Sequence, residues 1–384
     1  MIKAYDYCII NRTFWPKNKT IGEGLLNVSE NLANKKNNVL VICQSNKIKE
    51  HLDCENRGKN VTFKSFKDFN TRSSGIVIRS IEAFAFAIWV AMNLCTYRPK
   101  VIYIATDPPI IIPFIVVIIS KVIRSKVIYH FQDIHPEIFA SVKKIPIPLY
   151  NFLKFLDAYT QRQSTNLITI NEQMKEYLVS RVKICPEIHL VSNPANMDFS
   201  KVNNQIKKLR GFVYCGNIGR LQLIPILLKA IEKYLNEGGS MSFTFIGDGV
   251  NKNLVSDFAN NNKNFDFLGQ LSEEHANAEM CKYEWALLPI EAGVLDYAFP
   301  SKSSAYEVCD CKIFSISDAN SSLAKWVTEK RLGINSEVEI KNIVEGFWMI
   351  ENEHFEKEDA SLNLNNRSPS AFASKITDIL KANY

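Results

Sequence analysis

The chain has 384 residues, of which 46% are hydrophobic and 22% charged, and its formal net charge is +6. This composition is typical of a folded globular chain long enough for two domains, and it excludes a disordered or collagen-like protein. The nine cysteines are scattered, with no C-x-x-C pair and no His/Cys cluster at metal spacing. That pattern indicates a reducing cytosol, and it predicts no bound metal.

The positive charge is concentrated in the first half of the chain. Residues 1–190 contain 26 Lys and Arg against 15 Asp and Glu, a net of +11, whereas the remainder has a net of −5. An anionic partner is therefore expected on the first half. No helix-turn-helix or aromatic-plus-basic motif occurs, so nucleic acid is not predicted as a partner. An anionic membrane surface fits the charge, and a scattered solvated surface is the simpler alternative.

Two apolar stretches raise the question of a membrane span. Residues 81–95 include Glu82, and residues 108–120 contain three prolines and precede Lys121. Both are shorter than the roughly 18 residues that a spanning helix needs. They are predicted to be buried helices, and a membrane-docking helix is the less favoured interpretation of 81–95.

In chain order, strand and helix patterns alternate up to residue 193. Strands are expected at 5–10, 38–45, 100–106, 126–133, 166–170 and 188–193, and helices at 25–36, 76–96, 109–123 and 171–182. Residues 46–75 are polar and variable, and no element is predicted there. Apolar β-branched strands that alternate with helices predict a parallel sheet covered on both faces.

The alternation restarts after residues 194–209, which lose periodicity and are predicted to be a linker. Strands are expected at 211–217, 242–249, 265–270, 286–290 and 312–317, with helices at 222–236, 250–261, 272–284, 321–331 and 368–384. The expected fold class is α/β, with two doubly wound domains facing a cleft. Their bounds are 1–193 and 210–365, and the final helix, in 366–384, is expected to pack back on the first domain.

A glycine-bearing turn follows the first strand of each half. NRTFWPKNKTIGEG (11–24) ends with Gly22 and Gly24 just before a helix, and GNIGR (216–220) occupies the matching place in the second half. Glycines at a helix N-terminus allow close backbone approach, and the exposed N–H groups attract phosphate. A plain turn is the alternative for either loop. Neither half has G-x-G-x-x-G, which disfavours a dinucleotide dehydrogenase.

The segment FPSKSSAYEV (299–308) combines a cation, Lys302, with a carboxylate, Glu307. It follows the strand-like run 286–290, so it lies where a ligand would meet the end of a strand. Ser304 and Glu307 also fit the S-x-x-E capping box, which needs no ligand. Both interpretations, a cap and an anion site, are open from the segment alone.

Seven motifs occur in an order that resembles one known family. They are HFQDIHPE (130–137), VSNPAN (191–196), GNIG (216–219), FIGDG (245–249), FLGQLSEE (267–274), ALLPI (286–290) and FPSKSSAYEV (299–308). This set is similar to the family 4 glycosyltransferases, which have two Rossmann-like domains in the GT-B fold. The likeness covers nearly the whole chain. It is especially close to the bacterial branch that builds surface polysaccharides, including N-acetylfucosamine transferase-like members.

The resemblance implies roles for the matching residues of the second half. Glu307 matches the second glutamate of the family's Glu-x7-Glu motif, which accepts hydrogen bonds from the donor ribose. Lys302 and Arg220 would neutralise the donor diphosphate, whose charge grows as the leaving group departs. Gly216 and Asn217 would bring backbone close to that diphosphate. The turn that holds the nucleobase through its main chain would be Phe267, Leu268 and Gly269.

In the first half, the resemblance places His130 where it faces the transferred sugar, with Asp133 nearby. Both are expected to be catalytic together with Lys302, and a hydrogen-bonded core histidine is the alternative for His130. Gly22 and Gly24 would belong to the loop beside the donor phosphates and the acceptor.

The sequence departs from the family pattern at two positions. Phe299 stands where the motif has its first glutamate, and Glu291 and Asp296 in the preceding loop are the candidates to replace it. Gln222 stands where a lysine is usual before the second-domain helix, which weakens the case for Arg220 as a phosphate ligand.

The resemblance implies a metal-independent, retaining glycosyltransferase of hexosyltransferase type that needs no cofactor. It would move a sugar from a nucleotide sugar, a UDP-sugar, to a lipid-diphosphate-linked glycan in the synthesis of O-antigen, capsule or exopolysaccharide. The first domain would bind the acceptor at the inner face of the cell membrane, as a peripheral cytoplasmic protein. Two alternatives are a UDP-sugar 2-epimerase of the same fold and a catalytically degenerate partner subunit, which Phe299 favours.

Overall fold

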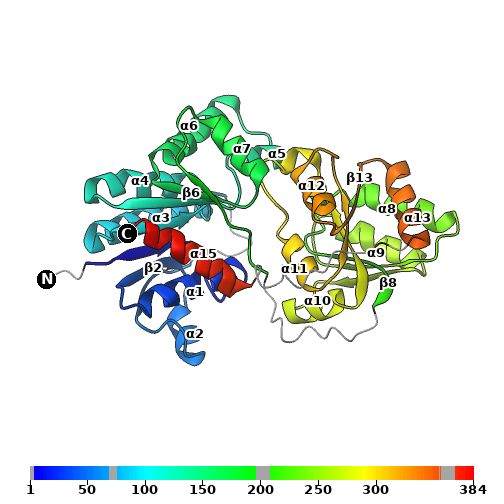
Figure 1. Ribbon diagram of the computed structural model, residues 1–384, viewed down its shortest axis with the longest axis horizontal. Helices are drawn as coiled ribbons and strands as arrows, with labels where there is room; N and C mark the ends of the chain where they lie inside the picture. The colour runs from blue at the N-terminus through cyan, green and yellow to red at the C-terminus, as the bar shows by residue number, and fades with distance from the viewer. Residues whose placement is uncertain (1–3, 69–75, 196–207, 354, 356–367) are drawn as a thin grey trace. The chain divides into compact units, whose positions relative to one another are not determined.

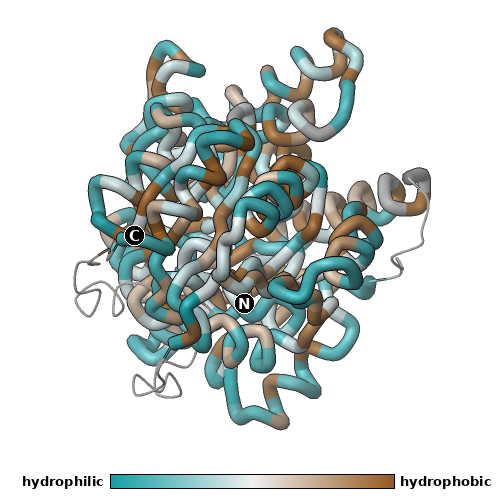
Figure 2. The backbone as a smooth tube through the Cα atoms, turned by 90° about the vertical axis from the view of Figure 1, so that its right-hand side faces the viewer, coloured by the Kyte–Doolittle hydropathy of each residue, from teal (hydrophilic) through white to brown (hydrophobic). Residues whose placement is uncertain are grey.

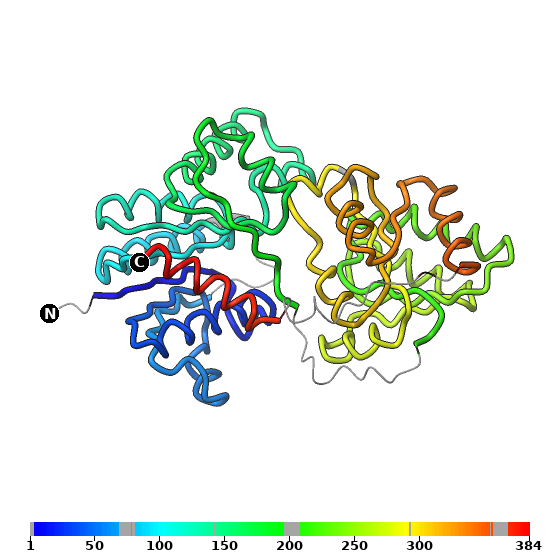
Figure 3. The backbone as a smooth tube through the Cα atoms, in the orientation of Figure 1, coloured from blue at the N-terminus to red at the C-terminus, as the bar shows by residue number. Residues whose placement is uncertain are grey.

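We describe a computed structural model of the chain, which covers residues 4–68, 76–195, 208–353, 355 and 368–384. The chain divides into two compact units, and each is described by itself. The first comprises Met1–Pro194 and Ser368–Tyr384, and the second comprises Ala195–Arg367 (Figures 1 and 3). Most of the predicted linker, residues 196–207, lies outside the described residues, as do residues 356–367 before the last helix.

The first unit contains a seven-stranded parallel sheet in the order β3-β2-β1-β4-β5-β6-β7. Its strands are β1 (Tyr7–Ile10), β2 (Val39–Gln44), β3 (Val61–Phe66), β4 (Val101–Ala105), β5 (Lys126–Phe131), β6 (Asn166–Thr169) and β7 (Ile188–Leu190). β1, β2, β4 and β6 are buried throughout because helices cover both faces of the sheet. The strand order reverses between β1 and β4.

Eight helices belong to the first unit as described. They are α1 (Ile21–Ala33), α2 (Ile48–Cys54), α3 (Ile76–Tyr97), α4 (Ile111–Ile123), α5 (Glu137–Val142), α6 (Ile147–Gln163), α7 (Glu172–Arg181) and α15 (Pro369–Ala382). The last helix, α15, lies beside α1 (Figure 1). Gly24 permits this approach, since an added Cβ would lie 2.6 Å from Cδ1 of Phe372.

The second unit contains a six-stranded parallel sheet in the order β10-β9-β8-β11-β12-β13. Its strands are β8 (Leu209–Cys215), β9 (Ser242–Ile246), β10 (Phe265–Gly269), β11 (Tyr283–Pro289), β12 (Lys312–Ile316) and β13 (Gly333–Ser336). Its helices are α8 (Ile224–Asn236), α9 (Lys252–Asn261), α10 (Glu273–Met280), α11 (Lys302–Val308), α12 (Ser322–Glu329) and α13 (Ile340–Asn352), with single turns η2 (Arg220–Gln222) and η3 (Ala292–Val294). An aromatic cluster of Phe212, Phe243, Phe314 and Phe347 fills its core.

Both units therefore have the doubly wound Rossmann-like topology, and the predicted α/β fold class is confirmed. The sequence did not predict α2 and β3, which lie inside the polar stretch 46–75, nor did it predict α5, α6, β13 and α13. The helix expected at 272–284 ends at Met280 because the chain enters β11 at Tyr283.

The apolar stretches 81–95 and 108–120 form most of α3 and α4. The prediction that both stretches are buried is wrong for one side of each helix, where Phe84 and Ile118 are exposed. None of the helices within the described ranges is long and apolar enough to cross a membrane. Hydrophobic and hydrophilic segments alternate along many of the helices (Figure 2).

Candidate functional site

The second sheet reverses its strand order between β8 and β11. The carboxyl ends of these two strands lead into residues 216–220 and Glu291. Open α/β sheets bind ligands at such a switch point. The two loops are joined there, since the backbone N–H of Glu291 donates to the carbonyl of Leu221 at 2.9 Å.

Gly216 and Lys302 are in close contact at this switch point. Gly216 has a φ of +140°, and an added Cβ would lie 2.3 Å from Cε of Lys302. Only glycine combines this backbone conformation with room for the lysine side chain. The predicted phosphate loop and the predicted phosphate cation are therefore brought together by the fold.

Tyr214 orients the ammonium group of Lys302. Nζ of Lys302 donates to the hydroxyl of Tyr214 at 2.6 Å, and that hydroxyl donates to the carbonyl of Asn217. Burial raises the pKa of Tyr214 well above its usual value, so the phenol keeps the proton that it donates. Tyr214 was not among the predicted site residues, although it lies two residues before Gly216 in a buried part of β8.

Burial lowers the pKa of Lys302 to about 7, because the charged ammonium group is poorly solvated there. The neighbouring Cys215 offsets this effect only when its thiol is ionised, and burial raises the pKa of that thiol. An anion bound beside Lys302 would favour the protonated form. The site is therefore suited to a phosphate or diphosphate group.

Tyr306 connects α11 to both strands at the switch point. The backbone N–H of Cys215 donates to the Tyr306 hydroxyl at 2.9 Å, and that hydroxyl lies 3.2 Å from the carbonyl of Leu287, to which it donates. Because Tyr306 is fully buried, α11 and its Lys302 are fixed against β8 and β11. Sequence reasoning also missed this residue.

The FIGDG turn after β9 packs tightly against the loop of Gly216. The backbone N–H of Gly216 donates to the carbonyl of Ile246, and that of Ile218 donates to the carbonyl of Asp248. An added Cβ on Gly247 would lie 1.8 Å from the carbonyl oxygen of Gly216. These glycines therefore serve the packing of two loops, and this packing positions Gly216.

Arg220 and Asn217 are exposed at the same loop. Within the part of the chain that the structure describes, Arg220 forms no hydrogen bond or ion pair, so its charge is available to an anion. The side chain of Gln222 is half-buried, and its Oε1 has no hydrogen-bond partner among the described residues.

The capping-box interpretation of Ser304 and Glu307 is wrong. The N-cap of α11 is Ser301, its side chain makes no capping hydrogen bond, and Ser304 lies inside the helix. Glu307 lies in the last turn and is 3% exposed. Its carboxylate therefore needs an explanation other than a cap at the start of α11.

The remaining donor-site candidates lie in the loop after β11 and at the end of β10. Glu291 is exposed and Asp296 is half-buried, whereas Phe299 packs edge-on against Trp326 with ring centroids 5.6 Å apart. At the end of β10, Phe267 and Gly269 are half-buried and Leu268 is exposed. The carbonyl of Gly269 accepts a 2.8 Å hydrogen bond from the backbone N–H of Gly247, which ties this turn to the glycine loops.

In the first unit, His130 is a core residue. Its side chain is 0% exposed, its Nδ1 lies 2.6 Å from the Tyr103 hydroxyl, and its ring stacks on Phe372 of α15. Burial lowers its pKa to about 3, so the imidazole is neutral. The ring is enclosed in the core of the first unit, as the core-histidine alternative expects, but its Nε2 has no hydrogen-bond partner among the described residues. A catalytic role for His130 stays a prediction.

Asp133 follows β5 and is half-buried. Its backbone N–H and that of Gln132 donate to Thr106 at the end of β4, at 3.3 and 3.2 Å. Burial raises the pKa of Asp133 to about 6, a value suited to proton transfer near neutral pH. Its neighbour His135 is half-buried as well.

The expectation for Gly22 and Gly24 is corrected by the structure. Both lie inside the first turn of α1 and are buried, rather than in a loop before it. An added Cβ on Gly22 would lie 2.6 Å from the backbone nitrogen of Trp15, and Gly24 contacts Phe372. Packing therefore accounts for both glycines.

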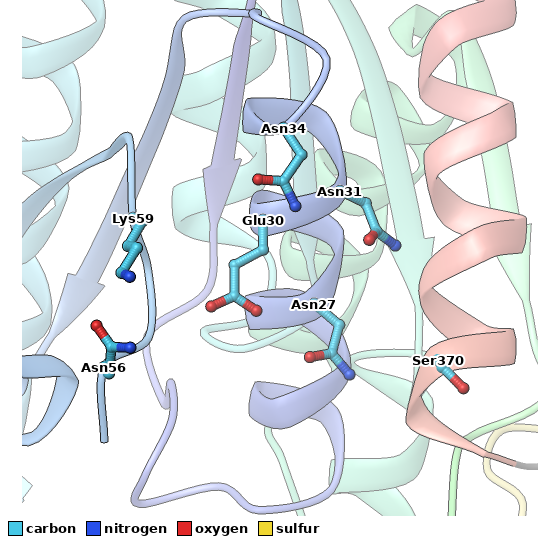
Figure 4. Close-up of a pocket in the computed structure, with 7 residues that line it drawn as sticks. All are labelled: Asn27, Glu30, Asn31, Asn34, Asn56, Lys59 and Ser370. Atoms are coloured by element: carbon cyan, nitrogen blue, oxygen red, sulfur yellow. The ribbon is translucent and has the colours of Figure 1, made fainter. Parts of the chain in front are cut away.

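A separate pocket of ≈ 370 Å³ opens on the first unit. Its lining is polar, and α1 contributes Asn27, Glu30 and Asn31, with Asn34 directly after the helix (Figure 4). The lining residues are Asn27, Glu30, Asn31, Asn34, Asn56, Lys59 and Ser370. None of the predicted site residues lies in this pocket. Across the described ranges, no group of three or more His, Cys, Asp or Glu side chains is placed to hold a metal ion.

Two Rossmann-like units of this topology define the GT-B type of fold, which glycosyltransferases and nucleotide-sugar epimerases share. No family model matches the chain. In sequence the chain is 24% identical over 268 residues to the probable glycosyltransferase WbjE of Pseudomonas aeruginosa, and the match spans 66% of each protein. The chain thus matches just under two thirds of the length of this relative.

Among solved structures, HepE of Anabaena in complex with UDP is similar at a TM-score of 0.66 and 13% identity, covering 98% of this chain and 100% of that one. The UDP-GlcNAc 2-epimerase of Methanocaldococcus jannaschii is similar at a TM-score of 0.61 and 12% identity, covering 98% and 99%. At these identities the structures establish the fold alone.

Proposed function

We propose that the protein is a glycosyltransferase that transfers a sugar from a nucleotide diphosphate donor, a UDP-sugar, bound by the second unit. The observation that carries this proposal is the contact between Lys302 and Gly216 at the switch point of the second sheet. A partly desolvated cation and close backbone at one point suit a diphosphate. The sequence likeness to WbjE and the fold shared with UDP-bound HepE support it.

In this proposal the diphosphate is the leaving group. Negative charge grows on it as the bond to the sugar breaks, and Lys302 and Arg220 stabilise that charge. Glu307 accepts hydrogen bonds from the ribose hydroxyls, and the backbone of Phe267–Gly269 holds the base. The reaction retains the configuration of the transferred hexose and needs neither a metal nor another cofactor. Excess EDTA should therefore leave turnover unchanged.

The acceptor is proposed to be a lipid-diphosphate-linked oligosaccharide, bound by the first unit at the inner face of the cell membrane. The support is the net charge of +11 in residues 1–190, which suits both an anionic lipid surface and a diphosphate. The product would be a surface polysaccharide, as in the N-acetylfucosamine transferase-like branch that the sequence resembles. Asp133 is the ionisable group that we assign to proton transfer on this side.

A UDP-sugar 2-epimerase is the second candidate, because the epimerase of M. jannaschii has the same fold. An epimerase must place acid and base groups on both sides of sugar C2. Asp133 in the first unit and Lys302 in the second each titrate near neutrality, with pKa values of about 6 and 7, so the reaction product is what distinguishes the two functions.

Incubation of the protein with a panel of UDP-sugars, with and without lipid-linked acceptor, tests the proposal. A glycosyltransferase releases UDP, faster when acceptor is present. An epimerase gives a new UDP-sugar and no UDP. A degenerate partner subunit, which Phe299 would favour, binds UDP without turning over, and that result would overturn the assignment of activity.

A further inference from the structure

We propose that the outer face of α3, α4 and α6 is a membrane-docking surface that binds an anionic lipid bilayer. The choice of a membrane rests in part on the lipid-linked acceptor of the proposed function. This apolar face is defined by Ile81, Phe84, Ile88 and Met92 on α3, Ile111, Ile118 and Val122 on α4, and Ile147, Leu149, Phe152 and Phe155 on α6, all of which are exposed.

The three helices are neighbours on one side of the first sheet. α3 lies beside α4, and α4 lies beside α6 (Figure 1). Phe114 of α4 packs on Tyr159 of α6 with ring centroids 5.6 Å apart, and Lys121 donates to the Tyr159 hydroxyl at 3.0 Å. The opposite side of the sheet is covered by α1 and α15, whose side chains share a core with the strands.

On α3, the exposed apolar residues follow the helix period. Ile81, Phe84, Ile88 and Met92 are spaced by three, four and four residues, which places them in one stripe. The residues between them, such as Phe86 and Val90, are fully buried against the unit. α3 is therefore apolar on both sides, and the exposed stripe has no partner among the described residues.

On α3, α4 and α6, the exposed charges of the described side chains are positive. The carboxylates of α3, α4 and α6 are Glu82 and Asp157, and both are buried. The cations near the helix ends, which are Lys121, Arg124, Lys126, Lys143 and Lys144, are all exposed. Exposed apolar side chains with cations and without exposed carboxylates complement the surface of an anionic bilayer.

A second copy of the chain fits this face less well than a membrane does. A two-fold contact would bring the same patch of each copy together, so the cations of one would meet the cations of the other. A large exposed apolar surface on a monomer marks an interaction site. The like charges around it favour a lipid surface over self-association.

The test is sedimentation with vesicles of phosphatidylcholine alone and of phosphatidylcholine with phosphatidylglycerol. The paired change Phe84→Gln and Ile88→Gln should reduce binding to acidic vesicles about tenfold or more, because apolar surface no longer inserts. The matched control is Val250→Gln with Leu254→Gln in the second unit. Val250 and Leu254 are 68% and 45% exposed, close to the 67% and 47% of Phe84 and Ile88. This control variant should bind the vesicles as wild type does.

A charge variant separates the electrostatic contribution. Lys143→Glu with Lys144→Glu should weaken binding to acidic vesicles at 0.1 M salt, where screening acts over about 10 Å, with little effect on neutral vesicles. Lys229→Glu with Lys263→Glu, exposed lysines of the second unit, is the control. Equal losses in the two pairs would show that net charge, rather than this face, is responsible.

Three results would overturn the proposal. The first is that the wild-type protein does not bind the vesicles. The second is that the Phe84→Gln and Ile88→Gln variant binds them as well as wild type does. The third is that the wild-type protein is a dimer without lipid and that the paired change Phe84→Gln and Ile88→Gln dissociates this dimer. The last would assign the face to a second copy. UDP-induced thermal stabilisation, measured on the same variants, should be unaffected. If wild type binds vesicles but gives no UDP response, the donor assignment fails while the docking surface stands.

Discussion

The ammonium group of Lys302 donates a 2.6 Å hydrogen bond to the hydroxyl of Tyr214, and that hydroxyl donates a hydrogen bond to the carbonyl of Asn217. The tyrosine thereby fixes the position of the cation relative to the loop that would approach a diphosphate. The strand that carries Tyr214 and the helix that carries Lys302 are also joined by Tyr306. The proposed donor site is thus held in place before any ligand arrives.

Replacing Tyr214 with Phe should weaken donor binding without unfolding the protein. The ring keeps its packing against Phe245, but the hydrogen bond that holds Lys302 is lost. A hydrogen bond from a charged group contributes about 1.5–3 kcal/mol, so UDP affinity should fall about tenfold or more. Isothermal titration with UDP measures this effect. An unchanged affinity would show that Lys302 needs no such support.

The pKa of Lys302 predicts how UDP affinity depends on pH. At pH 7 about half of the free protein carries the charge, and above pH 7 binding must take up a proton. Affinity should therefore fall by up to about tenfold per pH unit between pH 7 and 9. Because phosphate monoesters have a second pKa of about 6, UDP itself is fully ionised over this range. UDP titrations of the Lys302→Met variant should not show this dependence of affinity on pH.

The lowered pKa of Lys302 also affects the stability of the protein, which should rise with pH while UDP affinity falls. The folded pKa of Lys302 is lowered, so between pH 7 and its ordinary 10.5 the unfolded chain binds more protons than the native one. Lys302 therefore costs stability at neutral pH, and this cost disappears as pH rises through that window. Lys302→Met should melt higher than wild type at pH 7, with the difference shrinking toward pH 10. A lower melting temperature at pH 7 would contradict a desolvated lysine.

Gly216→Ala should disturb the protein through Lys302. The new Cβ would lie 2.3 Å from Cε of Lys302, and alanine at a φ of +140° costs about 1–3 kcal/mol. The variant should lose UDP binding and several degrees of melting temperature. Adding Lys302→Ala removes the clash, so the double variant should recover part of the stability while UDP binding stays lost. If the effects of Gly216→Ala and Lys302→Ala on melting temperature simply add in the double variant, Gly216 and Lys302 are not in contact.

Much of the fold followed from the sequence because its strands are buried on both faces. Continuous apolar runs such as those of β4 and β11 predict parallel strands, and the alternation with helices predicts the doubly wound topology. β3 was missed because it lies at the sheet edge, where every residue is half-buried and the polar residues Lys64 and Ser65 interrupt the pattern. β13 is the opposite edge strand of the second sheet, and its sequence, GINS, has little apolar signal.

The candidate site was predictable only in part. The spacing of motifs identified Gly216 and Lys302, but no sequence pattern shows that one packs on the other across 86 positions of the chain. Tyr214 and Tyr306 were overlooked because buried tyrosines resemble ordinary core residues until their hydrogen bonds are seen. His130 and Gly24 both contact Phe372 of α15, a helix more than 230 residues away, so their packing role could not be read locally.

His130→Gln should affect stability rather than catalysis. The side chain is buried with a hydrogen bond to Tyr103, so its loss should cost about 1–3 kcal/mol. The folded pKa of about 3 lies below the usual 6.5, so the unfolded chain binds more protons in that window and stability falls as pH drops below 6.5. The variant should therefore lose less melting temperature than wild type between pH 7 and pH 5. A normal melting curve with greatly reduced kcat would instead restore the catalytic assignment.

For Glu307, the structure removes one of the two interpretations that the sequence left open, the helix cap. It is buried in the last turn of α11 and takes no part in a cap at the start of that helix. If it accepts hydrogen bonds from the ribose, Glu307→Gln keeps one acceptor but loses the charge-assisted strength, about 1–2 kcal/mol, or roughly five- to thirty-fold in UDP affinity. Glu291→Gln and Asp296→Asn are the controls for Glu307→Gln. Both residues are candidates for contact with the transferred sugar, which is present in a UDP-sugar but absent from UDP. These two should leave UDP affinity unchanged and alter discrimination among UDP-sugars. Calorimetry with UDP and with UDP-sugars on all three variants separates the roles, and normal UDP binding by Glu307→Gln would place the ribose site elsewhere.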